Sequence, residues 1–451
     1  MLAEINPLAL EERAAQVVSA LEQGNLQSLP NLMQDLHAGD LAQLIQYLRP
    51  NLRADLIHAI LPHLDPEVLT FLDETVREEV TRLLNPQELA AAVSDLESDD
   101  AFLVIEDLDE DQQEQVLSSI TPEERQSLEE SLSYPEDSAG RLMQKEIVAL
   151  SKDCTVTQAI RYVARNKSLP DVFYDLVVID DKNHPLGLVP LSRLLNSPQK
   201  SSLWEIMNQG LQPIPVDTDQ ERVALMFKRY SLLSAPVVNE EGRLLGMITL
   251  DDVMDVIDEE AEEDIMHLGG IGASDFYFPI FSTSFARLQW LIITLLNTLL
   301  ASGVISHFQM ALEKKVALAV LMPIVAAMGG SAGMQVITVT VRALANQELN
   351  QLNMKRAVLK EVAVSLLNGL ICALLVGSVS FVWYGDISLS FVLGSAMIFN
   401  MFWAGFAGTL LPILVARLGM DPALSAGPLL NTTTDVFGFA IFLGLSVCFL
   451  L

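Results

Sequence analysis

Cysteine is rare in this sequence, and basic side chains are about half as numerous as acidic ones. The three cysteines, Cys154, Cys372 and Cys448, lie far apart and match no metal-ligand spacing, so neither a disulfide framework nor a zinc site is predicted. The chain carries 27 Lys and Arg against 58 Asp and Glu, a net charge of −31. Such a chain repels nucleic acid and attracts cations, so we expect no nucleic-acid partner.

Motifs of catalysis are missing as well. The six histidines include no His-Glu-x-x-His pair, which an intramembrane metalloprotease would need, and no Gly-x-x-x-x-Gly-Lys-[Ser/Thr] loop for nucleotide hydrolysis is present. We therefore expect that the protein is not an enzyme and that any transport it performs is passive or driven by the membrane potential.

Acidic residues almost disappear after residue 275. Only six occur there beside eight Lys and Arg, whereas residues 1–275 hold 52 acids against 19 Lys and Arg. Five apolar stretches fill the C-terminal part, and each is long enough to cross a hydrocarbon core of about 30 Å. Their approximate limits are 285–306, 316–344, 358–384, 388–416 and 423–450. The sequence thus predicts a membrane protein with a large acidic cytosolic half.

The few basic residues of the C-terminal part predict its orientation. With the N-terminal half in the cytosol, only Lys314 and Lys315 fall outside, and the other six fall inside, which the positive-inside rule favours. These six are Arg287, Arg342, Lys355, Arg356, Lys360 and Arg417. We expect a multi-pass protein of the cell (inner) membrane with its N-terminus cytoplasmic and its C-terminus outside.

One carboxylate, Asp435, lies in the middle of the last apolar stretch and follows Asn431-Thr432-Thr433-Thr434. A carboxylate at the centre of a membrane helix costs about 2.5–3.5 kcal/mol on insertion scales. Two interpretations follow: a buried polar patch that joins helices, or a cation site in a transmembrane pore, which we favour. No His or Cys lies near Asp435, as softer metals would prefer, yet cobalt, nickel and manganese stay open as alternatives to magnesium.

Glycine is concentrated in the second apolar stretch, within Gly329-Gly330-Ser331-Ala332-Gly333-Met334-Gln335. Glycines at this density let backbones approach closely or expose carbonyl groups. Ordinary helix packing by small residues is the alternative. We predict that the pore is lined by six residues, namely Gly329, Gly330, Ser331, Gly333, Gln335 and Thr434.

Before the membrane part, two patterns follow one another. Up to about residue 135, capping-box starts such as Asn85-Pro86-Gln87-Glu88 and Thr121-Pro122-Glu123-Glu124 predict short helices in a superhelix of imperfect repeats. From 136 to 255, two similar units each contain a hairpin, 176–189 and 235–249, followed by a helix.

This twofold repeat resembles a tandem pair of CBS domains, which bind adenine nucleotides. Thr249 and Asp252 match the Thr-x-x-Asp that contacts ribose in that family, so ATP or another adenine nucleotide is the cofactor that the resemblance implies here. Pro190 and Arg193 stand at the corresponding positions of the first unit, where nucleotide binding is in doubt.

An acidic helix is predicted between this repeat and the first membrane span, over about 256–284 and the residues just before it. Asp252, Asp255, Glu259 and Glu263 follow three- and four-residue spacing and share one face. Like charges so arranged destabilise an isolated helix, so a divalent ion or a second set of ligands would neutralise them. A solvated linker helix is the alternative.

Together these features resemble the MgtE family of magnesium channels over nearly the whole chain. The resemblance is carried by Tyr134-Pro135-Glu136-Asp137-Ser138-Ala139-Gly140-Arg141-Leu142-Met143, the acidic run 260–265, the glycine segment 329–335 and Asp421-Pro422-Ala423 ahead of Asp435. It implies a homodimer in the lipid bilayer, with Asp435 of both subunits in a pore between two bundles. It also implies that the acidic helix is a plug, closed by cytosolic Mg2+.

The matching regulatory acids are Asp252, Asp255, Glu260, Glu263, Asp264 and Asp421, with Asp99 and Asp100 in the N-terminal domain. Ser331 and Met334 replace two asparagines of the family pattern, which leaves the polarity of the pore mouth open.

The predicted architecture has four parts: an all-α superhelical domain (1–135), an α/β tandem CBS pair (136–255), a long plug helix (256–284) and a five-helix transmembrane bundle (285–451). The predicted function is Mg2+ uptake through a channel that cytosolic Mg2+ closes. Two alternatives stay open: transport of Co2+, Mn2+ or Ni2+, and a Mg2+ sensor that transports nothing.

Overall fold

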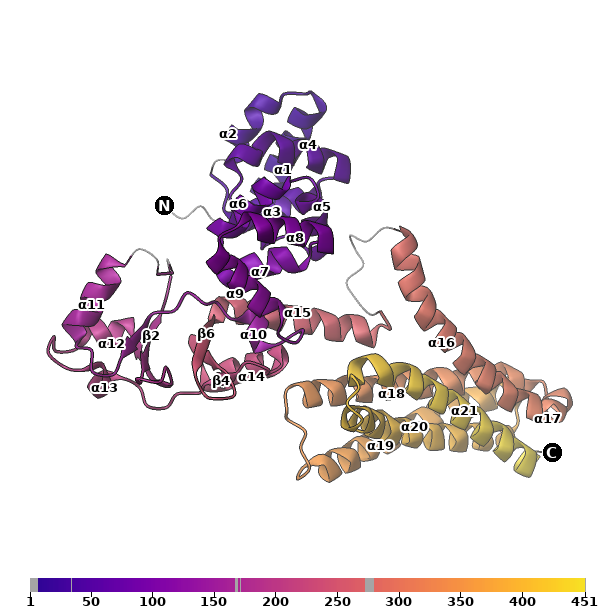
Figure 1. Cartoon of the computed structure of the whole chain (residues 1–451). Helices are drawn as coiled ribbons and strands as arrows, with labels where there is room; N and C mark the ends of the chain where they lie inside the picture. Colours follow the sequence, from indigo (N-terminus) through magenta and orange to yellow (C-terminus); the bar gives the residue numbers. More distant parts are fainter. Residues whose placement is uncertain (1–6, 34, 167–168, 171, 272–279, 451) are drawn as a thin grey trace. The chain divides into compact units, whose positions relative to one another are not determined.

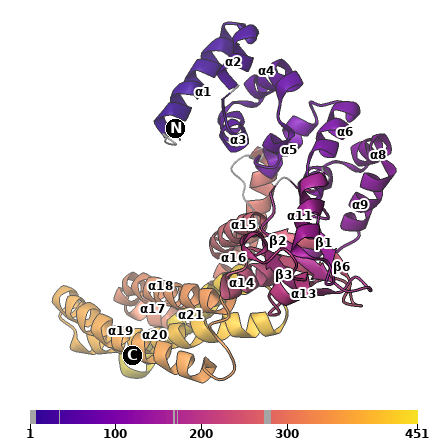
Figure 2. The same cartoon turned by 90° about the vertical axis from the view of Figure 1, so that its left-hand side faces the viewer.

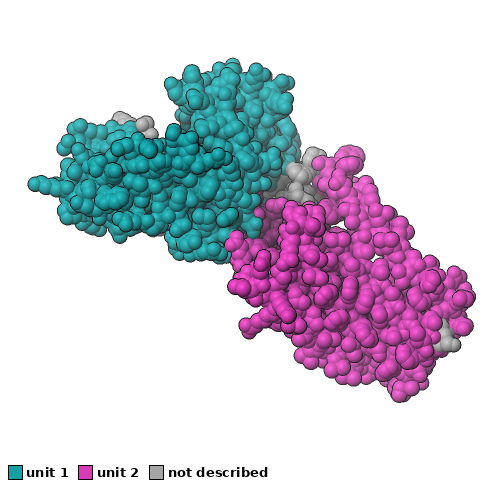
Figure 3. All heavy atoms as spheres, turned by 60° about the horizontal axis from the view of Figure 1, so that its bottom comes forward, with its two compact units in different colours: residues 1–258 teal, residues 259–451 magenta. Residues whose placement is uncertain are grey.

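A computed structural model describes residues 7–33, 35–166, 169–170, 172–271 and 280–450. The chain forms two compact units, residues 1–258 and residues 259–451, coloured separately in Figure 3. Each unit has its own hydrophobic clusters.

The N-terminal part of the first unit is a superhelix of short helices (Figures 1 and 2). The predicted capping boxes at Asn85 and Thr121 are confirmed, because both residues start helices whose third residue bonds back to the cap. The helices are α1 (Pro7–Glu22), η1 (Leu26–Ser28), α2 (Leu29–Met33), α3 (Ala38–Tyr47), α4 (Pro50–Ile60), η2 (Leu61–His63), η3 (Pro66–Leu69), α5 (Glu74–Thr81), α6 (Pro86–Asp95), α7 (Ser98–Glu106), α8 (Glu110–Ser119) and α9 (Pro122–Leu132).

The rest of the first unit confirms the predicted twofold repeat. Its two three-stranded sheets have the orders β1-β2-β3 and β4-β5-β6, and in each the first pair is parallel and the second antiparallel. The sheets are joined by a hydrogen bond of 2.7 Å that the Ser234 hydroxyl donates to Asp175. The elements are α10 (Ala139–Leu142), β1 (Ala149–Ser151), α11 (Val156–Arg165), β2 (Asp175–Ile179), β3 (Pro185–Pro190), α12 (Leu191–Asn196), α13 (Leu203–Ile206), β4 (Ile214–Pro215), α14 (Gln220–Tyr230), β5 (Ser234–Val238) and β6 (Leu244–Thr249).

Two basic residues tie the superhelix to this repeat. Lys145 pairs with Glu130 of α9 at 2.8 Å. Arg141 pairs with Glu106 of α7, and its guanidinium lies 5.6 Å from the centre of the Phe102 ring. These contacts hold α7 and α9 against the segment that leads into the first sheet.

The acidic helix predicted from the sequence is α15 (Leu250–Leu268), which starts directly after β6. Its first turns are anchored by Val253 and Val256, which are buried against the second sheet. The prediction placed this segment over 256–284; residues 272–279 lie outside the described residues, and residue 280 already belongs to the next helix.

The second unit contains the five membrane-length helices that the sequence predicts, so the predicted fold class is confirmed. Helix α20 lies at the centre of the bundle and packs against α18, α19 and α21, whereas α16 packs against α21 (Figures 1 and 2). The helices are α16 (Ile280–His307), α17 (Gln309–Lys314), α18 (Ala317–Ala345), α19 (Met354–Tyr384), α20 (Ile387–Arg417) and α21 (Pro422–Leu450).

Candidate functional site

A crevice of about 460 Å3 opens between α18 and α21 in the second unit. We call it the α18–α21 crevice; it is lined by Gly330, Ser331, Met334, Gln335, Thr338 and Asn431. Two amides and two hydroxyl groups place polar atoms in its wall, although the helices that carry them are largely apolar. Amide and hydroxyl groups that face a crevice between membrane-length helices are typical of a path for water or ions.

Asp435 follows Asn431 by four residues on α21, so both side chains lie on the same face of the helix. Its side chain is half-buried, and within the described part of the chain its carboxylate has neither a hydrogen-bond nor an ion-pair partner. The neighbouring hydroxyl groups of Thr432 and Thr433 donate to carbonyls of their own helix, those of Pro428 (2.8 Å) and Leu430 (3.0 Å). Their oxygen lone pairs are therefore left to accept from water or from a hydrated ion.

The predicted pore-lining residues divide into two groups. Gly330, Ser331 and Gln335 line the crevice. The other three lie inside the bundle: Gly329 packs on Asn400, Gly333 packs on Leu430, and the Thr434 hydroxyl donates to the Leu430 carbonyl at 3.0 Å. Thr338 was missed, although it continues the spacing of residues 331, 334 and 335 along one helical face.

Carboxylates of two helices that are far apart in sequence, α7 and α15, lie close together in the first unit. We call them the α7–α15 acid cluster: Glu97, Asp99, Asp100, Asp251, Asp252 and Asp255. The predicted residues Asp99 and Asp100 thus do lie near Asp252, whose charge raises the pKa of both, and the charge of Asp255 also raises the pKa of Asp100. Glu97 was not predicted, because only the packing of α7 on α15 brings it there.

Burial and like charges set the pKa values in this cluster. Burial, then the charges of Glu146 and Asp100, raises the pKa of Glu97 to about 7. Burial, then the charge of Asp252, raises the pKa of Asp100 to about 6. Burial likewise raises the pKa of Asp252 to about 6 and that of Asp99 well above its ordinary value. Deprotonating the cluster at neutral pH is therefore costly unless a cation arrives.

The geometry of the cluster decides what kind of cation it suits. Nowhere in the described ranges do three His, Cys, Asp or Glu side chains stand close enough to hold a metal ion directly. A magnesium ion usually keeps several of its waters and is held by one or two carboxylates, so it fits a looser cluster of this kind. A closed zinc or calcium cage would need a tighter set of ligands.

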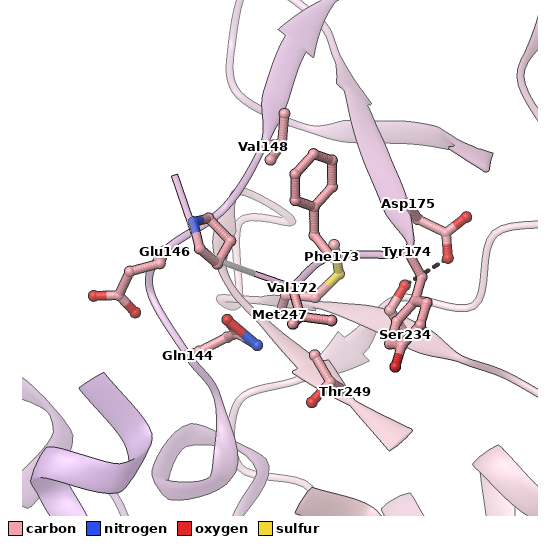
Figure 4. A pocket seen from close by; sticks show the side chains of 11 residues that line it. Gln144, Glu146, Val148, Val172, Phe173, Tyr174, Asp175, Ser234, Met247 and Thr249 are labelled. Carbon is pink, nitrogen blue, oxygen red and sulfur yellow. Dashed lines mark hydrogen bonds between the residues drawn. The ribbon is translucent and has the colours of Figure 1, made fainter. Parts of the chain in front are cut away.

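The two residues predicted to contact a nucleotide, Thr249 and Asp252, form a hydrogen bond with each other where β6 ends and α15 begins. The Thr249 hydroxyl donates to the Asp252 carboxylate at 2.6 Å. Thr249 also lines a small pocket between the two sheets, with Phe173, Met247 and the joined pair Asp175 and Ser234 (Figure 4). The free space is about 20 Å3, room for about one water, so a nucleotide would require these side chains to move apart.

At the corresponding place in the first half of the twofold repeat, Arg193 has hydrogen-bond partners within the protein. Its guanidinium donates to the Asn208 side chain at 2.5 Å and to the Ile206 carbonyl at 3.1 Å. A crevice of about 230 Å3 lies beside it and is lined by Pro190 and Asn208, among others. An aspartate, which would accept from a ribose hydroxyl, is absent from this position.

The C-terminal end of α15 belongs to the second unit and meets the start of α21. His267 is only 8% exposed, and its Nδ1 lies 2.7 Å from Asp421 and its Nε2 3.4 Å from Glu263. Burial and the charge of Asp421 raise the pKa of Asp264, while His267 lowers it. Glu263, Asp264 and Asp421, all predicted regulatory acids, therefore lie together, and Glu260 lies one turn earlier on the same helix. His267 itself was not predicted.

Comparisons with known proteins follow the same division of the chain. Family models match at residues 322–445 (MgtE, divalent cation transporter), 36–137 (MgtE intracellular N domain) and 139–200 and 203–259 (CBS domain). The chain is 34% identical to the magnesium transporter MgtE of Thermus thermophilus, over 97% of this chain and 98% of that one. It is 32% identical to the magnesium transporter MgtE of Bacillus subtilis over 71% of each chain.

Among solved structures, a cytosolic domain of a relative is similar to part of the chain. The cytosolic domain of the Mg2+ channel MgtE in complex with ATP matches 54% of this chain and 99% of that chain, at 30% identity and a TM-score of 0.50.

Proposed function

The chain belongs to the MgtE family of divalent cation transporters, and on this premise we propose that it is a Mg2+ channel of the cell membrane that works as a homodimer. The observation that carries the proposal is the carboxylate of Asp435, which has no hydrogen-bond or ion-pair partner among the described residues and shares a helical face with Asn431 of the α18–α21 crevice. An unpaired carboxylate at membrane depth is costly unless an ion uses it.

A second copy of the chain completes the ion site in this proposal. The crevice opens on one face of the bundle, so two copies that bring these faces together enclose a path with one Asp435 on each side. Two carboxylates hold a divalent ion better than a monovalent one. Because Mg2+ gives up its waters reluctantly, the threonine oxygens and the amides of Asn431 and Gln335 would contact its hydration shell.

Regulation uses the acids outside the membrane. When cytosolic Mg2+ is high, ions bind between α7 and α15 and relieve the repulsion within the α7–α15 acid cluster. Helix α15 then acts as the plug, since its other end meets the start of α21 through His267 and Asp421. When Mg2+ is low, the repulsion separates α7 from α15 and frees the plug. Asp252, Asp255, Asp99 and Asp100 hold the ions at one end, and Glu260, Glu263, Asp264 and Asp421 at the other.

Adenine nucleotide binding is part of the same proposal. Thr249 and Asp252 would contact the ribose, and Phe173 offers an apolar wall for the base. The name of the similar structure states that the relative's cytosolic domain binds ATP. Because Asp252 also belongs to the acid cluster, nucleotide and Mg2+ would act on one side chain.

The test is ion flux into proteoliposomes that contain the full-length chain. Protease added outside cleaves only the chains whose N-terminal half faces outward, which distinguishes the two orientations. We expect Mg2+ flux that stops when Mg2+ on the N-terminal side reaches millimolar levels. If Co2+, Ni2+ or Mn2+ crossed the membrane as fast as Mg2+ or faster, that ion would be the transported ion in place of Mg2+. Absence of flux of any ion, with Mg2+ binding retained, would identify a sensor instead.

A further inference from the structure

Asn400 is a polar residue in the interior of the transmembrane bundle. It lies on α20 with 0% of its surface exposed, and its Nδ2 donates to the Val325 carbonyl of α18 at 2.8 Å. Its Oδ1 is buried and, among the described residues, has no conventional hydrogen-bond partner. A buried amide with one unsatisfied oxygen costs free energy, so a leucine would pack here at lower cost.

Two glycines leave the space that this amide fills. A Cβ atom on Gly329 of α18 would overlap the Asn400 amide, and one on Gly438 of α21 would lie 2.8 Å from Nδ2. The amide is therefore held between two helix backbones.

The same two glycines connect Asn400 to the candidate ion site. Gly330, next to Gly329, lines the α18–α21 crevice and faces Asn431. Gly438 lies three residues after Asp435, one turn along α21. Asn400 thus contacts α18 beside the crevice wall and α21 one turn beyond Asp435, and its one directional bond fixes α18 along its axis relative to α20.

We propose that Asn400 is a positioning residue for ion binding: it sets the distance and register of α18 and α21, and so the place of the Asp435 carboxylate on α21 relative to Gly330 on α18. This inference rests on the proposed function of Asp435. Buried asparagines elsewhere fix the register of packed helices at a cost in stability, which is the physical reason for an amide here. A leucine of similar volume fills the space but leaves the helices free to slide.

The first experiment compares Asn400→Leu with Thr409→Val in the full-length protein. Thr409 is also buried on α20, but its hydroxyl donates to Gly405 of its own helix at 2.9 Å, so it joins no other helix. We expect Asn400→Leu to raise the half-saturating Mg2+ concentration of flux about three- to tenfold, as for one lost positioning hydrogen bond, with thermal stability retained or increased. Thr409→Val leaves half-saturation unchanged. A fall in maximal flux alone, in proportion to folded protein, would overturn the proposal.

The second experiment keeps the inference testable if Asn400→Leu does not fold. Gly438→Ala pushes a methyl group against Asn400, whereas Gly444→Ala on the same helix adds one to open space. We expect half-saturation to rise for Gly438→Ala alone. Equal values for the two variants would overturn the proposal. If the proposed role of Asp435 is wrong, Asp435→Asn leaves the flux intact, whatever the Asn400 variants do. The two proposals can therefore fail separately.

Discussion

Nδ1 of His267 lies 2.7 Å from the Asp421 carboxylate, and this contact joins the last turn of α15 to the first residue before α21. The same carboxylate accepts from the backbone N–H groups of Ala423 (2.9 Å) and Leu424 (3.1 Å), so it caps α21 as well. Next to it, Leu268 packs against the buried apolar cluster that contains Ala423 and Leu430. The end of the proposed plug is thus held by a direct polar contact and by apolar packing.

Removing this imidazole should therefore weaken closure. We expect His267→Ala to raise the Mg2+ concentration that half-closes the channel about two- to tenfold, the range for one hydrogen bond to a charged or polar group. Single-channel recordings with Mg2+ titrated on the N-terminal side measure this half-closing concentration. Glu262→Gln, an exposed change on the same helix, is the control and should behave as the unmodified chain does.

Neutralising Glu260, Glu263 and Asp264 together to Gln, Gln and Asn should leave the channel open at millimolar Mg2+. The physical reason is that an ion bridging α15 to Asp421 loses most of its ligands on the helix. Patch recordings at several Mg2+ concentrations test it. If these recordings still showed closure, α15 could not be the plug.

The raised pKa values predict a dependence on pH in the absence of Mg2+. In the compact form, the pKa of Glu97 is about 7 and those of Asp100 and Asp252 about 6, above the ordinary values of 4.5 and 3.8. Such groups stabilise the compact form fully below their ordinary pKa and lose that contribution as the pH rises through 6 to 7. Amide hydrogen exchange of α7 in the full-length protein should therefore be slower at pH 5 than at pH 8.

Mg2+ should remove most of this pH dependence, since it replaces the protons at high pH. The triple variant Glu97→Gln, Asp100→Asn and Asp252→Asn removes the three groups with these pKa values, so its α7 should exchange slowly at both pH values without Mg2+. Exchange that speeds up equally with pH in this variant, after correction for intrinsic rates, would place the pH effect elsewhere.

Thr249→Val should weaken ATP binding about two- to tenfold, because it removes one hydroxyl that orients Asp252 and reaches the pocket. Isothermal titration of the purified chain with ATP measures it. Arg193→Ala changes the first half of the twofold repeat and should leave the affinity for ATP unaltered. If the unmodified chain, Thr249→Val and Arg193→Ala bound ATP with equal affinity, the nucleotide would lie in another pocket.

Hydropathy and local signals predicted most of the fold. The five spans, the caps at Asn85 and Thr121 and the paired hairpins follow from side chains that are close in sequence. Which glycine faces the crevice could not be predicted, since Gly329 and Gly330 differ by about 100° around α18 and only the packing of Asn400 identifies the inner one. Glu97, His267 and Asn400 were missed for the same reason: their partners come from distant segments.

The central claim is that Asp435 binds the transported ion, and Asp435→Asn tests it most directly. Mg2+ uptake is measured in proteoliposomes beside Glu313→Gln, which neutralises an acid on α17 of the same unit. We predict that Asp435→Asn lowers uptake at least about tenfold, as loss of a poorly solvated charge contact requires, while Glu313→Gln leaves it unchanged. Near-normal uptake by correctly folded Asp435→Asn protein would contradict the account.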